Sequence, residues 1–305
     1  MSRRRSAGPV CLEQIGTELE PSTSTSTSTG SQNTMPSHKP SQPLPPMYPK
    51  PNNKAATSLI LRLYPLIAWS HIDPKYWEQL QITCSKLDLS WESENGGNFL
   101  RLMTHEQMRR IARQYAFDQI RDPSRDPRHP FHDSDHMASY LSRHLDATSD
   151  DGKTLVEQLP WDCNPPDHVM LNKLRYFPAG CNWAVENILD VKGASLPHIN
   201  CTLTEAGELD ESTLMFSEVW CILWLTIHCH RDPQKAKFEV VPVTVATISG
   251  PTFRIVQGYV DGKTGIVNIR KSAIVPIGPD KNTMKEQMML MVRWLIAEPV
   301  WPSRH

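Results

Sequence analysis

The chain has 305 residues, enough for one large domain or two small ones, and its formal net charge of −1 excludes a global attraction to nucleic acid or to an anionic membrane. Charged residues make up 21% and hydrophobic residues 39% of the chain, a balance that predicts a folded body with a disordered fraction. The seven cysteines are scattered without a CxxC pair, which argues against a zinc ribbon or a dithiol redox motif and favours reduced, intracellular thiols.

Membrane, cofactor and substrate signals are weak throughout. The most apolar run, Val219–Cys229, is much shorter than the roughly twenty residues that span a bilayer. The basic N-terminus lacks the apolar segment of a signal peptide, so we expect neither secretion nor membrane insertion. The chain contains no P-loop, GxGxxG or GxSxG stretch, and the sequence therefore indicates no cofactor and no small-molecule substrate.

Residues 1–53 hold an alternating Ser-Thr tract followed by closely spaced prolines. Such a composition cannot bury enough apolar surface to offset the entropy of ordering, so it predicts a disordered tail. Its one basic cluster is Arg3, Arg4 and Arg5.

Residues 54–160 are expected to form a helical region. Helices are predicted over 55–69, with Pro65 kinking or ending the first, and over 74–89 and 104–121. Thr104 and Gln107 have the spacing of a capping box, which marks the start of the third. A proline-containing loop follows over 122–133, and another helix begins near Asp135.

Residues 161–305 are expected to form an α+β domain. Helices are predicted from Pro165 or Pro166, over 181–189 and over 211–231. The segments 238–249, 252–260 and 265–275 are rich in Val, Ile and Thr and predict a three-stranded antiparallel meander. Pro242 indicates an edge strand or a bulge, and 261–265 a hairpin loop. A helix over 282–299, with Asn282 as N-cap, completes a helix–meander–helix unit.

The stretch HPFHDSDHMASYLSRH, residues 129–144, is a candidate metal site. His132 and His136 are four residues apart, and Asp133 lies between them; two helical histidines at this spacing can share a metal. With the N-cap at Asp133 or Ser134, however, His132 lies before the helix and the shared face is lost. We predict that the stretch binds no metal. A metal-dependent hydrolase that uses it is the alternative.

The predicted meander carries a candidate nucleic-acid surface. Arg254, Tyr259, Arg270 and Lys271 cluster on it, and aromatic and basic side chains on strands can stack bases and meet phosphates. Strand alternation places Arg254 and Tyr259 on different faces, so the four residues need not form one patch.

The segment VVPVTVATISGPTFRIVQGYVDG (240–262), together with MVRWLIAEP (291–299), resembles orphan proteins of filamentous fungi of the hypoxia-responsive morphology factor type, which are encoded in subtelomeric clusters. The resemblance covers roughly residues 160–300 and contains no chemically specific motif. It implies a nuclear regulatory protein that alters the expression of neighbouring genes and affects colony and biofilm morphology and fitness in hypoxia. Such a protein needs a nuclear-import signal, for which Arg3, Arg4 and Arg5 are the candidate residues, although this cluster lacks the usual second basic group.

The leading functional hypothesis is therefore a non-enzymatic nuclear regulator that acts through protein or RNA contacts. Two alternatives stay open: the metal-dependent hydrolase, and a structural or interaction protein without catalysis.

Overall fold

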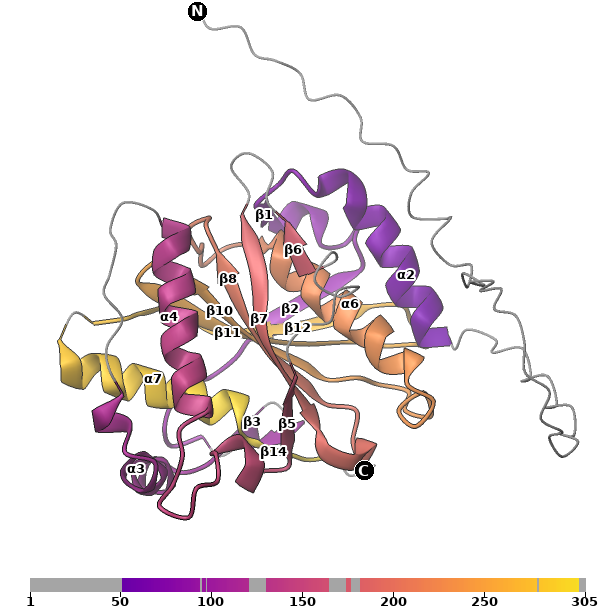
Figure 1. The fold of residues 1–305 in the computed structure, drawn as a ribbon. Helices are drawn as coiled ribbons and strands as arrows, with labels where there is room; N and C mark the ends of the chain where they lie inside the picture. The colour runs from indigo at the N-terminus through magenta and orange to yellow at the C-terminus, as the bar shows by residue number, and fades with distance from the viewer. Residues whose placement is uncertain are drawn as a thin grey trace, which may run out of the picture. The chain divides into compact units, whose positions relative to one another are not determined.

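The computed structural model of the protein describes residues 51–93, 95–96, 98–120, 130–164, 174–176, 182–278 and 280–301. Its largest element is a nine-stranded mixed sheet (Figure 1). The strands are β2 Ile82–Lys86, β5 Trp161–Asn164, β6 Arg175–Tyr176, β7 Trp183–Val191, β8 Ile199–Glu205, β10 Val243–Ser249, β11 Thr252–Val260, β12 Val267–Lys271 and β13 Val275–Pro276. They pair in the order β2-β12-β11-β10-β8-β7-β5, with β13 beside β11 and β6 beside β7. The pairs β8–β10 and β2–β12 are parallel.

Two small sheets accompany the large one. One pairs β1 His71–Ile72 with β9 Leu214–Met215, and the other joins β14 Glu298–Pro299, β4 Leu100–Arg101 and β3 Asn95–Gly96. The second brings the end of the described chain next to residues from its first third.

Helices cover both faces of the large sheet. The α-helices are α2 Pro51–Leu63, α3 His105–Gln114, α4 Pro130–Leu145, α6 Phe216–Arg231 and α7 Lys281–Leu295. The 3-10 helices are η1 Tyr64–Leu66, η2 Pro74–Tyr76, η3 Phe117–Gln119, η4 Val156–Gln158 and η5 Lys192–Ala194. In Figure 1, α4 and α7 lie on the left of the sheet, and α2 and α6 on its right. Correspondingly, the buried apolar side chains form two clusters, one with α2 and α6 and one with α3, α4 and α7. None of the described helices is long and apolar enough to cross a bilayer.

The predicted fold class is wrong. The described chain is not divided into a helical half and a meander, because one mixed sheet takes strands from both predicted regions, 54–160 and 161–305. The predicted helix over 181–189 is largely β7, and the second half of the predicted helix over 74–89 contains β2. Both stretches are short and apolar, and such stretches fit a helix or a strand equally well until pairing with distant strands decides.

The three C-terminal strands are present as β10, β11 and β12, and each pairs antiparallel with the next. The inference of an edge strand from Pro242 is wrong. β10 lies between β8 and β11, and all of its residues are buried. Pro242 lies just before the strand, where it accepts a hydrogen bond from the Ile199 amide, so its missing N–H interrupts no pairing inside β10.

The predicted starts of three helices can be compared with the observed ones. The capping box of Thr104 and Gln107 is present at α3. In α7 the N-cap is Asp280 rather than Asn282. The prediction that this helical segment begins near Asp135 is also wrong, because α4 begins at Pro130. Proline suits the first turn of a helix, where no intrahelical partner is needed for its nitrogen.

Most of the predicted tail, residues 1–50, lies outside the described residues. Its last three residues, 51–53, belong to α2.

Candidate functional site

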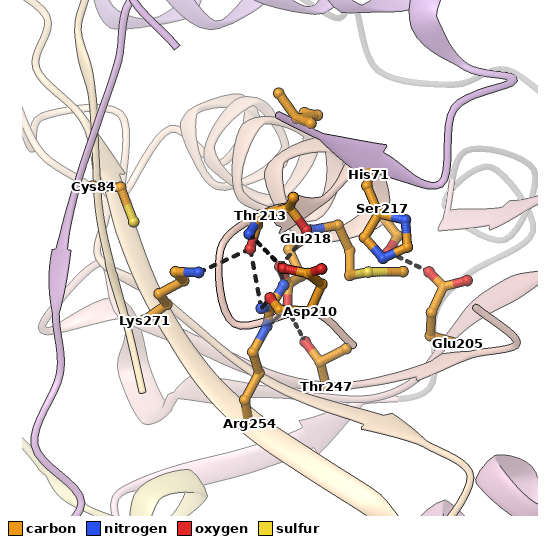
Figure 2. Close-up of polar contacts among 12 residues, drawn as sticks. His71, Cys84, Glu205, Asp210, Thr213, Ser217, Glu218, Thr247, Arg254 and Lys271 are labelled. Atoms are coloured by element: carbon orange, nitrogen blue, oxygen red, sulfur yellow. Dashed lines mark hydrogen bonds and ion pairs between the residues drawn. The ribbon is translucent and has the colours of Figure 1, made fainter. Parts of the chain in front are cut away.

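A buried polar network lies where β8, β10 and the first turn of α6 meet (Figure 2). Glu205 is the last residue of β8, Thr247 lies near the end of its parallel neighbour β10, and Glu218 is in the first turn of α6. In mixed and parallel sheets, ligand sites often occur at this edge, where strands end and a helix begins.

Arg254 and Glu218 form an ion pair at the centre of this network. Both side chains are fully buried. The guanidinium donates from Nε to Glu218 Oε1 at 2.7 Å and from Nη2 to Oε2 at 2.5 Å. Glu218 also accepts from Thr247 Oγ1 at 2.9 Å and from the Met215 amide at 2.9 Å. The pair is thus fully hydrogen-bonded by the protein itself, as a buried pair must be to persist.

Arg254 and a second cation, Lys271, bind backbone carbonyls of the loop between β8 and β9. Arg254 Nη1 donates to the carbonyls of Asp210 at 2.8 Å and Thr213 at 3.1 Å. Lys271 Nζ donates to the carbonyls of Glu211 and Thr213, as Figure 2 shows for Thr213. These two residues of the predicted nucleic-acid surface are therefore engaged inside the fold, and the buried guanidinium of Arg254 cannot contact a phosphate in this conformation.

Glu205 is the carboxylate of the network that has no cationic partner among the described residues. Its Oε2 accepts from Ser217 Oγ at 2.6 Å, and Oε1 accepts from the amides of Ala206 and Gly207. Burial raises the pKa of the Glu205 carboxyl to about 7, and the charge of Glu218 acts in the same direction. The group can exchange a proton near neutral pH, but it is only 2% exposed, which keeps a substrate away from it.

The histidine-rich stretch forms the start of α4. Because this helix begins at Pro130, His132 and His136 are both helical, contrary to the sequence inference. Asp133 Oδ1 and His136 Nδ1 are buried without a hydrogen-bond partner. Among the side chains that the structure describes, which do not include that of His132, no group of three or more potential metal ligands occurs. The described side chains thus provide no ligand set for the metal-dependent hydrolase hypothesis.

The four residues of the predicted nucleic-acid surface divide between the two faces of the sheet. Arg254 and Lys271 lie on the α6 face, as their contacts with Glu218 and the β8–β9 loop require. Tyr259 and Arg270 lie on the opposite face, because alternate residues of a strand point to opposite sides. Tyr259 pairs with Asn268 and Gln257 with Arg270, so Tyr259 and Arg270 are diagonal neighbours across β11 and β12, within reach of one another.

The outer strands present a polar surface on this second face. We call it the outer face and define it by Thr83, Ser85, Tyr259, Asn268 and Arg270. Thr83 and Ser85 are exposed, and the other three are partly exposed. Thr83 Oγ1 donates to Asn268 Oδ1 at 3.0 Å. Within the described part of the chain, the Arg270 side chain makes no hydrogen bond or ion pair. The outer face thus has a cation that no described residue binds.

An aromatic row continues from Tyr259 along one end of the sheet. It comprises Tyr259, Phe99, His198, Trp301 and Phe238. Successive ring centroids are separated by 5.3, 6.2, 6.3 and 5.6 Å. His198 is buried, whereas Trp301 is 38% exposed. No local pattern in the sequence predicts this row, because its members come from five separate segments.

Arg3, Arg4 and Arg5 lie outside the described residues.

In comparisons with known proteins, no family model, no curated protein and no solved structure matches this chain.

Proposed function

We propose that the protein is a non-enzymatic nuclear regulator of gene expression, which binds a partner through the outer face and the adjoining aromatic row. The observation that carries the proposal is the placement of Tyr259 and Arg270 as diagonal neighbours on a partly exposed sheet face. The resemblance to fungal hypoxia-responsive morphology factors supports the regulatory part, including effects on colony and biofilm morphology.

The side chains of this surface are of the kinds that dominate binding energy. Tyr, Trp and Arg are enriched among the residues whose truncation weakens interfaces most. Tyr259 and Trp301 supply aromatic surface, and Arg270 supplies a guanidinium that no described residue engages. By contrast, Arg254 and Lys271 already bind groups of the chain itself, so a partner would gain little from them.

Localisation tests the nuclear part of the proposal. A fluorescent fusion of the full chain is expected to concentrate in the nucleus, and replacing Arg3, Arg4 and Arg5 by alanine is expected to weaken this accumulation. Exclusion of the unmodified fusion from the nucleus contradicts the proposal.

Transcript measurements test the binding surface. Raised expression of the protein should change transcripts of other genes, and the Tyr259→Ala, Arg270→Ala double variant should lose this response. Lys263→Ala, which changes an exposed cation in the hairpin loop between β11 and β12, is the matched control and should retain it. A response that survives the double variant at equal protein level contradicts the role of the outer face.

A further inference from the structure

We infer that the partner of the outer face is a single-stranded nucleic acid, whose bases stack on the aromatic row and whose phosphates contact Arg270 and Lys237. This inference rests on the proposed binding surface and names the class of its ligand.

Stacking is the first requirement, and the aromatic row provides the rings. Tyr259 and Phe99 meet edge to face, with an angle of 66° between their planes, so their contact covers one face of one ring and leaves the other faces of the pair for other contacts. Trp301 is the most exposed member of the row and contacts Phe238 at a tilt of 46°. Base–aromatic stacking tolerates any sequence, because every base has a π-face.

Cations lie at the two ends of this arrangement. Arg270 lies beside Tyr259, and its guanidinium has the planar fork that matches phosphate oxygens. Lys237 is exposed, and its Nζ lies 5.1 Å from the ring centroid of Phe238, the last member of the row. A strand that follows the rings would therefore meet one positive charge at each end.

The rest of the outer face offers hydrogen-bonding groups of the kind that contact sugars and base edges. Thr83 donates to Asn268 Oδ1, and this bond leaves the two N–H groups of the Asn268 amide to donate elsewhere. Ser85 adds an exposed hydroxyl on the neighbouring strand. Aromatic rings bordered by such donors on the surface of a sheet are a recurrent way of holding unpaired bases.

The composition of the surface favours a single strand over a protein or a duplex. A protein interface usually has an apolar, fully buried centre, but the side chains of β2 and β12 on the outer face are hydroxyl, amide and guanidinium groups. In a duplex the bases stack on each other, so few base faces are accessible to the aromatic side chains. It also carries dense phosphate charge, which two cations on a chain of net charge −1 would match poorly.

Fluorescence anisotropy with the full-length protein tests the inference. The probes are a short labelled single-stranded RNA of mixed sequence, the DNA strand of the same sequence, and the RNA annealed to its complement. We expect the single strands to bind at least tenfold more tightly than the duplex. The RNA and DNA probes distinguish which sugar is preferred.

Four variants assign the contacts. Trp301→Ala and Tyr259→Ala should each weaken binding of the single strand by roughly five- to a hundredfold, the loss expected for one base–aromatic stack. Tyr259→Phe keeps the ring and should bind as the unmodified protein does. Arg270→Gln should weaken binding and reduce the slope of log affinity against log salt by about 0.7, the value for one phosphate contact of a single strand.

The outcomes separate this inference from the proposed function. Equal binding of duplex and single strand, or affinity unchanged by both aromatic truncations in folded variants, overturns the inference. If no nucleic acid binds while the Tyr259→Ala, Arg270→Ala variant still loses the transcript response, the partner is a protein, and only the proposed function stands. If single strands bind as expected but the double variant keeps the transcript response, the inference stands and the proposed regulatory role fails.

Discussion

The two faces of the β11–β12 hairpin give two arginines opposite environments. On the α6 face, Arg254 is fully buried and bonds to Glu218, Asp210 and Thr213. On the outer face, Arg270 is partly exposed and makes no side-chain bond with any described residue. The two residues lie on neighbouring strands of one sheet. Strand alternation and the position of α6 decide that the first arginine stabilises the fold and that the second is available to a partner.

The two faces also differ in whether their polar side chains are bonded within the protein or exposed to solvent. On the α6 face, carboxylates and basic groups are fixed within the network that holds the β8–β9 loop. On the outer face, hydroxyl, amide and guanidinium groups remain in contact with solvent. Substitutions on the first face should therefore change stability, and those on the second should change binding.

Removing Arg254 gives the largest expected effect. Arg254→Met leaves the Glu218 carboxylate buried and without its cation, which should lower the free energy of unfolding by about 3–5 kcal/mol. Chemical denaturation measures the change. The Arg254→Met, Glu218→Gln double variant should be less destabilised than Arg254→Met alone, because it contains no unpaired buried charge. An equal or greater loss of unfolding free energy in the double variant would show that the unpaired Glu218 charge is not the cause of the destabilisation.

Glu205 should make the α6 face sensitive to pH. Its pKa is raised from 4.5 to about 7 in the folded protein, so the folded chain keeps a proton that the unfolded chain releases. Stability should therefore fall as pH rises from about 4.5 to 7, by on the order of 3 kcal/mol in total.

The test of this pH dependence is the difference between the protein and Glu205→Gln. His144 and His198 also make the free energy of unfolding of the unmodified protein depend on pH, because burial lowers the pKa of each to about 4. These histidines remove stability as pH falls from 6.5 towards 4, the opposite direction. Subtracting the Glu205→Gln curve leaves the Glu205 contribution, and a flat difference between pH 4.5 and 7 would rule it out.

Gly258 tests how tightly the α6 face is packed. A Cβ added at this residue of β11 would lie 2.7 Å from Ile222 Cδ1 in α6, so Gly258→Ala should destabilise the protein by about 1–3 kcal/mol through overpacking. Thermal or chemical denaturation measures it. Ile222→Val removes the clashing methyl group, so the two substitutions together should cost less than the sum of their separate effects. Strict additivity would mean that the clash is relieved by other movements.

The smallest effect is expected on the outer face. Arg270→Ala should change the free energy of unfolding by less than about 0.5 kcal/mol, as is usual for a surface residue without partners. The contrast with Arg254→Met in the same denaturation assay is the direct test of the comparison. A loss of about 2 kcal/mol or more would place Arg270 in the stabilising network.

Local signals in the sequence predict several elements correctly. Val243–Ser249, Thr252–Val260 and Val267–Lys271 are strands because β-branched residues and the intervening turn residues favour that structure wherever the strands pair. The capping box at Thr104 likewise defines α3 through bonds within one helical turn. Alternation along β11 is enough to place Arg254 and Tyr259 on opposite faces, because it depends only on the number of residues between them.

The amino-acid sequence thus sets the local geometry, whereas tertiary contacts assign the role of each residue. β7 is a strand because β5 and β8 pair with it, which short apolar periodicity cannot reveal. Arg254 is buried because Glu218, distant in the chain, is its partner, and Arg270 is free because none of the described residues binds its side chain. The aromatic row exists only because the fold brings Phe99 and Trp301 together around His198. Contacts within a turn or a strand depend on neighbouring residues, but burial and partnership depend on segments that only the folded chain brings into contact.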